Sequence, residues 1–376
     1  MKIACIATSQ VPSSTANSIQ VMKACQALAQ VGNEVCLWVP GARGAEWAAL
    51  AEQYGLITPF EVRWLPTRQV WRRYDLAWNA ARAAKQWGAR VVYTWAPQAA
   101  VFAQWRGLPA VLELHDRITG KVGPLWFRWF LQSRRPKRLL LITEALRAVL
   151  ERQFGMALPA PVTQIAPNGT EMERYENLPA AEDARRQLGL PQGLTAVFSG
   201  HFYAGRGTDL LFELARHLPE LNFVWVGGRE KDVAALREKL AEANMENVVL
   251  SGFVPNAHLP LYQAAGDFLL MPYERSIAGS GGGDSAAICS PMKMFDYLAA
   301  GRVIVTSELP VLHEILNEHN AVFCPPEDAA AWADALRGLM RDPARRESLS
   351  ARAREDAHSY TWKARAERAL DGLRQA

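Results

Sequence analysis

Short apolar runs alternate with helix-like segments along the whole chain, and this alternation restricts the fold more than any other feature. Runs such as KIACIAT (2–8) and EVCLWV (34–39) are apolar almost throughout, and a stretch with helical periodicity, 18–30, separates them. Strands of this kind are typical of a parallel sheet with helices on both sides, because only there are both faces buried. The pattern therefore predicts an α/β fold of doubly wound parallel sheets.

The pattern restarts after a polar stretch at about 177–193. The first series continues through the runs at 90–95, 110–115 and 138–143, and the second comprises those at 195–200, 222–228, 247–252, 267–272 and 302–307. A chain of 376 residues exceeds what one core usually supports. We therefore expect two Rossmann-like domains, 1–175 and 190–354, with ligands at the carboxyl ends of the strands, in a cleft that the domains share.

Charge is distributed unevenly along the chain. Residues 1–150 contain 19 Lys and Arg, 8 Asp and Glu and ten of the 13 Trp, whereas the remainder contains 23 basic and 30 acidic residues. This asymmetry indicates two domains with different ligands. There is no run long enough to cross a membrane, no signal-peptide pattern and no CxxC pair among the five Cys. We therefore expect a cytoplasmic chain with reduced thiols.

The segment CSPMKMFDYLAAG begins with a strong helix-start signal. Ser290 is a good N-cap and Pro291 a good first helical residue, since the missing N–H of proline would be unpaired there. The N–H groups of Met292 and Lys293 would then point out of the helix, where the helix dipole attracts anions. This start predicts a diphosphate site, although a well-capped core helix is an equal reading of the residues alone.

Two further features extend this interpretation. Asp296 follows about 9 Å along the same helix, where it can bind the hydroxyls of a ribose. The loop in FSGHFYAGRGTDLL joins a strand to a helix near Thr208 and contains His201 and Arg206. Arg206 offers a forked set of donors to phosphate oxygens. Two loops of this kind in one domain favour a phosphate site.

The order of these motifs resembles that of the family 4 glycosyltransferases, which are retaining enzymes of the GT-B fold. The resemblance is carried by GHFYAGRGTDLL, SPMKMFDYLAAGRVIVTSELPVLHEIL, SSTANSIQVMKACQALAQVGNEV, PNGTEMERY, SGFVPNAHLPLYQAAGDFLLMPY and SYTW. These motifs span about residues 3–365. The resemblance implies the GT-B arrangement, in which 355–376 crosses back to the N-terminal domain.

The resemblance also implies roles for residues of the C-terminal domain. Arg206, in the place of a family lysine, and His201 contact the donor diphosphate. Asp296 takes the place of the carboxylate that binds the ribose. The backbone around Phe253 and Val254 borders the nucleobase.

In the N-terminal domain, the resemblance assigns two residues to the transferred sugar and the acceptor. His115, within ELHDR, matches a histidine beside the transferred sugar, so that it joins Arg206 and Asp296 as a candidate catalytic residue. Asn17 lies in a loop that approaches the sugar and the acceptor. From the residues alone, structural interpretations are favoured: His115 as a histidine that caps Asp116 or a loop, and Asn17 as a helix-start residue.

Three positions depart from the family pattern. His201 replaces a common Arg, which makes part of the charge pH-dependent because His titrates near neutrality. Asp296 is shorter than the usual Glu. Ile288 stands where the family has a carboxylate for the donor sugar, and Asp284, or less readily Glu274, could substitute for it.

The resulting functional prediction is retaining transfer from a nucleoside-diphosphate sugar to a glycan, lipid-linked or small-molecule acceptor. No cofactor, bound metal or nucleic acid is expected, since cationic side chains and a helix dipole neutralise the diphosphate. Ile288 leaves open a catalytically impaired nucleotide-sugar binding protein. A dinucleotide-dependent oxidoreductase is disfavoured, because TSQVPSSTANS after the first strand contains no GxGxxG turn.

Aromatic and basic residues interleave in KVGPLWFRWFLQSRRPKRLLLIT, residues 121–143. One interpretation is a surface that contacts anionic lipid at the inner membrane face, suited to a lipid-linked acceptor. The other, favoured for the aromatic residues alone, is a helix packed in the core and followed by a solvated basic loop.

Overall fold

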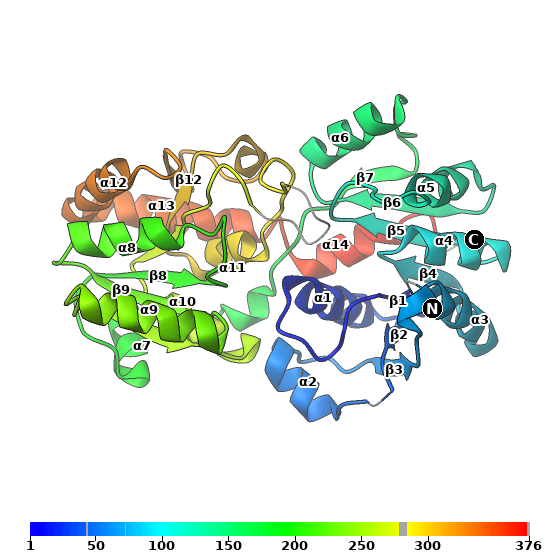
Figure 1. Cartoon of the computed structure of the whole chain (residues 1–376), viewed down its shortest axis with the longest axis horizontal. Coiled ribbons are helices and arrows are strands. Elements are labelled where there is room, and N and C mark those ends of the chain that lie inside the picture. Colours follow the sequence, from blue (N-terminus) through cyan, green and yellow to red (C-terminus); the bar gives the residue numbers. More distant parts are fainter. Residues whose placement is uncertain (43, 72, 278–283, 374–376) are drawn as a thin grey trace. The chain divides into compact units, whose positions relative to one another are not determined.

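A computed structural model describes residues 1–42, 44–71, 73–277 and 284–373. The chain forms two compact units (Figure 1). Unit 1 comprises Met1–Asn168 and Trp362–Ala376, and unit 2 comprises Gly169–Thr361. Residues 169–175 and 355–361, which the sequence analysis placed with the first domain, thus belong to unit 2.

Unit 1 contains a parallel sheet in the order β3-β2-β1-β4-β5-β6-β7. Its strands are β1 (Lys2–Ile6), β2 (Glu34–Pro40), β3 (Glu61–Leu65), β4 (Val91–Thr94), β5 (Ala110–Leu114), β6 (Lys137–Leu141) and β7 (Thr163–Ile165). The order reverses at β1 and β4. Such a switch point is where loops diverge and leave room for a ligand at the carboxyl ends of the strands.

The helices of unit 1 cover both faces of this sheet. They are α1 (Ala16–Gln30), α2 (Trp47–Tyr54), α3 (Tyr74–Trp87), α4 (Pro97–Trp105), α5 (Gly123–Gln132), α6 (Glu144–Phe154) and α14 (Trp362–Ala369), with a short 3-10 helix η1 (Gln69–Trp71). Helices α3, α4 and α5 pack side by side on one face, and α1 packs with α2 and α14 on the other (Figure 1). The C-terminal helix α14 is therefore an integral part of unit 1.

Unit 2 contains a second parallel sheet in the order β10-β9-β8-β11-β12-β13. Its strands are β8 (Thr195–Ser199), β9 (Asn222–Val226), β10 (Val248–Gly252), β11 (Phe268–Met271), β12 (Val303–Ser307) and β13 (Ala321–Cys324). The strand order has the same reversal, here at β8 and β11. The prediction of two doubly wound parallel sheets is confirmed.

The helices of unit 2 bury large aromatic side chains against its sheet. They are α7 (Ala181–Leu188), α8 (Thr208–His217), α9 (Glu230–Glu242), α10 (Leu259–Ala264), α11 (Met292–Ala300), α12 (Ala329–Arg341) and α13 (Pro343–Ala357), with 3-10 helices η2 (Met172–Arg174), η3 (Asn256–His258) and η4 (Pro310–Glu314). Phe198, Trp225 and Trp332 are buried in one core cluster between α8, α12 and the sheet. Among the residues that the structure covers, no helix is long and apolar enough to span a bilayer.

Candidate functional site

The loop before α8 lies at the switch point of the unit 2 sheet. Gly207, the residue that precedes α8, has φ +72° and presses against the end of β11. A Cβ at this position would lie 1.8 Å from the carbonyl oxygen of Pro272. Glycine is therefore required for this approach. The close fit holds the neighbouring Arg206 at the carboxyl edge of the sheet.

Glu274, from the segment after β11, supports the same loop. Its Oε2 accepts a hydrogen bond from the backbone N–H of Gly205 (3.2 Å), and its Oε1 accepts one from that of Gly207 (3.1 Å). Both carboxylate oxygens thus bind the backbone on either side of Arg206. From the sequence, Glu274 was expected only as a substitute for the missing sugar-binding carboxylate. In the structure its carboxylate instead stabilises the loop around Arg206.

Arg206 contacts aromatic groups and forms no ion pair with Asp or Glu in the described part of the chain. Its Nη2 donates to the hydroxyl of Tyr203 at 2.6 Å. Its guanidinium carbon lies 4.9 Å from the ring centroid of Tyr203 and 5.2 Å from that of Tyr273. Two aromatic faces thus orient the guanidinium. Its charge has no acidic partner among these contacts.

The ammonium of Lys293 lies close to the same place. Its Nζ is 4.1 Å from the ring centroid of Phe198. A Cβ at Gly200 would lie 2.8 Å from the same Nζ atom, so the ammonium packs against this glycine. Burial, and next the positive charge of Arg206, lower the pKa of Lys293 well below its ordinary value. Within the described ranges, Lys293 also forms no ion pair. The neighbouring residues 278–283, which lie outside those ranges, contain no Asp or Glu in their sequence. Two neighbouring cations without an acidic partner favour a bound anion.

The helix that contributes Lys293 begins one residue later than predicted. Helix α11 starts at Met292, and Pro291, with φ −66° and ψ 126°, is its N-cap, so the assignment of Ser290 as N-cap and Pro291 as first helical residue was wrong. The extended ψ of Pro291 keeps it outside the helix, and its side chain offers no acceptor. The first turn of α11 thus presents N–H groups without a side-chain cap, as an anion site requires.

Asp296 lies one helical turn after Lys293 and already has an internal partner. Its Oδ1 accepts a hydrogen bond from the hydroxyl of Thr170 at 3.1 Å. After burial, the largest influence raising the pKa of Tyr175 is the charge of this carboxylate, so the two groups are close. The carboxylate predicted to bind a ribose therefore also holds the start of unit 2 against α11. Its ribose role stays a prediction.

The remaining donor-side candidates follow strands of the same sheet. Phe253 and Val254 come directly after β10, and the side chain of Phe253 is 55% exposed. The N–H of Gly227, after β9, donates to the carbonyl of Gly252 at 2.7 Å. The ring of His201, after β8, stacks on Tyr203 with a centroid distance of 5.8 Å. The structure therefore brings these residues to the edge where Arg206 lies.

Asp284 and Ile288 have different roles in the segment before α11. The Oδ1 of Asp284 accepts hydrogen bonds from the N–H groups of Ile277 and Ala286, both at 2.9 Å, and so organises a turn. Ile288 is fully buried, so the position where the family has a carboxylate is part of the core. The glycine run 281–283 lies outside the described residues.

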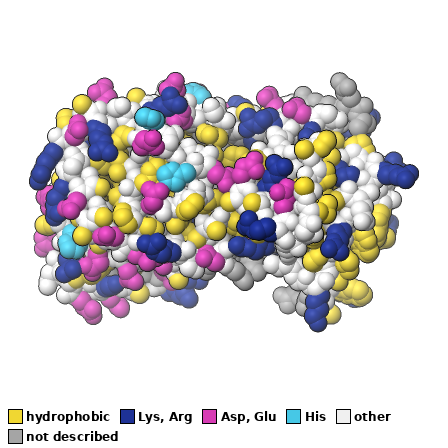
Figure 2. Space-filling view, turned by 90° about the horizontal axis from the view of Figure 1, so that it is seen from above, with side chains coloured by type: hydrophobic (Ala, Val, Ile, Leu, Met, Phe, Trp, Pro, Cys, Tyr) yellow, Lys and Arg dark blue, Asp and Glu magenta, His cyan; other side chains and the backbone are white. Residues whose placement is uncertain are grey.

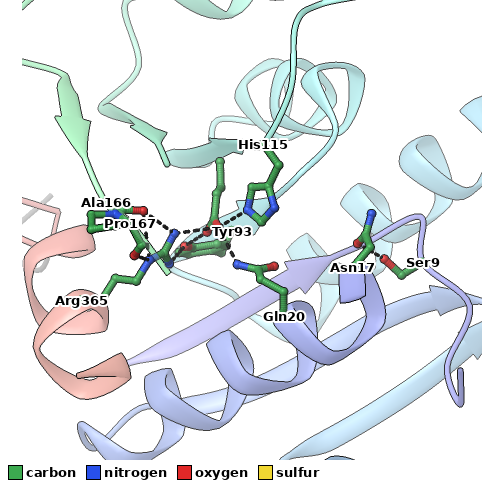
Figure 3. Close-up of polar contacts among 9 residues, drawn as sticks. Ser9, Asn17, Gln20, Tyr93, His115, Ala166, Pro167 and Arg365 are labelled. Atoms are coloured by element: carbon green, nitrogen blue, oxygen red, sulfur yellow. Dashed lines mark hydrogen bonds and ion pairs between the residues drawn. The ribbon is translucent and has the colours of Figure 1, made fainter. Parts of the chain in front are cut away.

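In unit 1, His115 and Asn17 lie near the carboxyl ends of β5 and β1 (Figure 3). Asn17 is in the first turn of α1, is exposed, and accepts a hydrogen bond from the hydroxyl of Ser9 at 2.6 Å. His115 contacts Glu113, with its Nε2 2.5 Å from Oε1 of that carboxylate. In place of the cap on Asp116 that the sequence offered as a structural alternative, the ring of His115 thus contacts the carboxylate of Glu113.

Sequence reasoning identified neither Glu113 nor three of its four partners. Glu113 is fully buried on β5 and contacts Gln20, Tyr93 and Arg365 as well as His115 (Figure 3). One feature of the sequence could have revealed Glu113: it is the single carboxylate in the apolar run AVLEL. A carboxylate in a buried strand is stable only when it is paired, so this position predicts a buried polar contact. Gln20, Tyr93 and Arg365 come from segments distant in the sequence and have no signal of their own. No group of three His, Cys, Asp or Glu suited to a metal occurs in the portion of the chain that was described.

Both halves of the chain match known family profiles. Residues 18–174 match "Glycosyltransferase Family 4", and residues 193–342 match "Glycosyl transferases group 1". The chain belongs to the family 4 glycosyltransferases. Similar solved structures include Anabaena Alr3699/HepE in complex with UDP-glucose, with a TM-score of 0.75, 17% identity and 100% of both chains covered. WaaG, from lipopolysaccharide biosynthesis, has a TM-score of 0.68 at 17% identity, again with 100% of both chains covered. The fold of this family 4 member is therefore GT-B.

Curated relatives resemble only part of this chain. D-inositol 3-phosphate glycosyltransferase of Kineococcus radiotolerans is 28% identical and covers 64% of this chain and 57% of its own. Phosphatidyl-myo-inositol mannosyltransferase of Mycolicibacterium smegmatis is 26% identical and covers 68% of this chain and 62% of its own. The chain thus spans about three fifths of the length of these relatives.

Proposed function

We propose that this family 4 glycosyltransferase transfers a sugar from a nucleoside-diphosphate sugar to an acceptor hydroxyl, with retention of configuration. The observation that supports it most is the pair of cations, Arg206 and Lys293, at the carboxyl edge of the unit 2 sheet, neither of which has an acidic partner among the described residues. Similar folds have been solved with UDP and with UDP-glucose. UDP-glucose is therefore the first donor to test.

In the proposed reaction, the bond from the sugar C1 to the diphosphate oxygen breaks as the acceptor oxygen bonds to C1 on the same face. The departing diphosphate takes the proton of the acceptor hydroxyl. Arg206, His201, Lys293 and the start of α11 stabilise the charge that develops on the diphosphate, without a resident metal. We assign the ribose to Asp296, the nucleobase to Phe253 and Val254, and the transferred sugar and acceptor to Asn17, His115 and Asp284.

A second candidate function is nucleotide-sugar binding without efficient transfer. The burial of Ile288 favours it, because no carboxylate stands at the position that contacts the donor sugar in the family. Release of free nucleoside diphosphate from a donor distinguishes the two candidates. A transferase releases it slowly even without an acceptor, whereas a binding protein does not.

Thermal unfolding in the presence of nucleotides tests the proposed function. UDP, GDP and ADP, with their sugar conjugates, are compared at equal concentration, and the corresponding monophosphates are the control. A ligand at a hundred times its Kd stabilises the native state by about 2.7 kcal/mol, which raises the Tm of a unit of this size by about 5–11 °C. One diphosphate should shift the Tm far more than its monophosphate. Equal Tm values throughout the panel would contradict the proposal.

A cluster of aromatic rings on unit 1 supports contact with a membrane. The rings of Tyr74, Trp78, Phe102, Trp105, Trp126 and Trp129, from α3, α4 and α5, lie 5.0–5.9 Å apart between centroids. We name this set the aromatic cluster. Trp105 is 60% exposed and Trp129 44% exposed, whereas Phe127 and Phe130 on the opposite side of α5 are buried. The buried Phe side chains fit the core-packing interpretation of this segment, and the exposed Trp side chains support the lipid-contact interpretation.

On the face of unit 1 that Figure 2 shows, Lys and Arg side chains lie among hydrophobic ones. The guanidinium of Arg106 lies 4.0 Å from the ring centroid of Trp78, and Arg128, Arg134 and Arg135 are exposed. Exposed Trp side chains beside cations fit the interface of a bilayer that contains anionic lipid. We propose that unit 1 docks on such a surface and that the acceptor is lipid-linked.

Vesicle co-sedimentation tests the docking surface. Trp105→Gln together with Trp129→Gln should weaken pelleting with vesicles of phosphatidylcholine and phosphatidylglycerol by about tenfold or more, since two large apolar side chains are lost. Ile57→Ser, which removes an exposed apolar residue outside the aromatic cluster, is the matched control. Binding that is equal for both variants, or equal for neutral and anionic vesicles, would argue against this proposal.

A further inference from the structure

Glu113 is a buried carboxylate that accepts hydrogen bonds from four different segments of unit 1. Its Oε1 accepts from Nε2 of Gln20 at 2.5 Å and from Nη2 of Arg365 at 2.7 Å, and lies 2.5 Å from Nε2 of His115. Its Oε2 accepts from the hydroxyl of Tyr93. Figure 3 shows these side chains converging from α1, β4, α14 and the end of β5. The cluster thus joins elements that are distant in the sequence.

Arg365 closes the cluster from the C-terminal helix. Its Nε donates to the carbonyl of Pro167 at 2.8 Å, its Nη2 to that of Ala166 at 3.2 Å, and its Nη1 to the hydroxyl of Tyr93 at 3.1 Å. The guanidinium is therefore fixed in orientation by contacts other than Glu113. A carboxylate held by so rigid a partner is itself a rigid acceptor for the ring of His115.

The ionised state of Glu113 decides the tautomer of His115. Burial alone would raise the pKa of Glu113, but the charge of Arg365 and the hydrogen bond from His115 hold it well below its ordinary value. An ionised carboxylate has only acceptor atoms, so Nε2 of His115 must be the donor. In the neutral ring, Nδ1 then has no hydrogen and is an acceptor.

We propose that Glu113 is a positioning residue that fixes the ring and tautomer of His115, so that Nδ1 accepts a hydrogen bond from a sugar hydroxyl. His115 has 30% of its side chain exposed, and Nε2 is its one hydrogen-bonded ring nitrogen among the residues described. The identity of the hydroxyl rests on the proposed transferase function. The tautomer rests on the cluster alone, so the two can fail separately.

Two double variants isolate the acceptor that His115 uses. Glu113→Gln with Arg365→Met and Glu113→Leu with Arg365→Met both remove the ion pair as a whole, which avoids an unpaired buried charge. The Gln side chain retains an oxygen that can accept from Nε2 of His115, whereas Leu does not. The two proteins therefore differ chiefly in this one acceptor.

The 15N NMR spectrum of the His115 ring reports the tautomer. It is recorded at a pH where the ring is neutral, and the ring signals are assigned because they are missing from the spectrum of His115→Ala. We expect the Nε2–H form in the wild type and in the Gln variant, and an averaged signal from both tautomers in the Leu variant. The Nδ1–H form in the wild type, or identical ring signals in all three proteins, would overturn the proposal. This measurement needs no substrate.

Turnover of UDP-glucose, or of the donor identified in the thermal screen, provides the second readout. We expect kcat of the Leu variant to be about tenfold to a hundredfold below that of the Gln variant, as is typical when a group that orients a functional histidine is lost. In a His115→Ala background the two should agree within about twofold. A difference that persists without His115 would show a general structural role and overturn the proposal. If the wild type turns over no donor, the proposed function fails while the ring spectrum still tests Glu113.

Discussion

Arg206→Ala is expected to lower turnover about a hundredfold while the protein remains folded. The guanidinium lies near two aromatic rings and contacts no carboxylate in the described structure, so its charge is available to the departing diphosphate. Removal of one preorganised contact to a developing negative charge costs ~3 kcal/mol of transition-state stabilisation. The effect should appear in kcat, measured by release of nucleoside diphosphate, because the charge on the leaving group is greatest in the transition state.

Arg216→Ala is the matched control for this experiment. Arg216 lies on α8, ten residues beyond Arg206, but is exposed and paired with Glu213. Its loss should change turnover by less than about twofold, since exposed ion pairs contribute little. Near-normal turnover in Arg206→Ala, with an unchanged Tm, would remove Arg206 from the diphosphate site.

Lys293→Met is expected to change stability and ligand affinity in opposite directions. Lys293 is half-buried beside Arg206 with no acidic partner among the described residues, so its charge costs stability in the unliganded protein. Methionine retains the length of the side chain, and the unliganded variant should gain about 1 kcal/mol or more. A charge-assisted contact to phosphate is lost at the same time. The affinity for the cognate nucleoside diphosphate should fall about tenfold or more.

The affinity should also depend on pH through Lys293. Its pKa is lowered in the free protein, and a bound anion favours the charged form, so ligand binding takes up a proton. Affinity should therefore be highest at pH values below the lowered pKa and should fall as the pH rises above it. Titration calorimetry between about pH 7.5 and about pH 9.5, above the titration of His and of a terminal phosphate, measures this slope. In Lys293→Met the slope should disappear.

Lys239→Met provides the control. Lys239 also lies over an aromatic ring, 4.4 Å from the centroid of Phe212, but it is exposed and paired with Asp209. This substitution should leave both the Tm and the affinity close to those of the wild type. An unliganded Lys293→Met that is less stable than the wild type, or a pH slope that persists in it, would show that the ammonium is not an uncompensated charge.

The strands that sequence patterns revealed are mostly those buried on both faces. All ten apolar runs became strands, because a strand covered on each side by helices must be apolar at every position. The three strands that the patterns missed, β3, β7 and β13, lie at the edges of their sheets. Edge strands are covered less completely, so polar residues such as Glu61, Arg63 and Gln164 are tolerated in β3 and β7, and the apolar pattern is lost there.

The candidate donor site was predictable where it depends on local backbone. A glycine-rich turn and a helix start are encoded by adjacent residues, so Arg206 and Lys293 could be identified from the sequence, although the cap at Pro291 was misplaced by one residue. The side-chain contribution of Lys293 was not predictable. It depends on how α11 packs against the end of β8, which brings Nζ against Gly200.

By itself, the sequence determined the two doubly wound sheets, the family and the residues of the two phosphate-type loops, because each of these follows from neighbours in the chain. The tertiary structure alone decided which charges are paired. Glu274 binds the loop around Arg206, and Glu113 meets Arg365 across a separation of 252 residues, while Arg206 and Lys293 meet no carboxylate in the described structure. Charge pairing depends on distances between segments that only folding brings together, and such distances leave no periodic trace in a sequence.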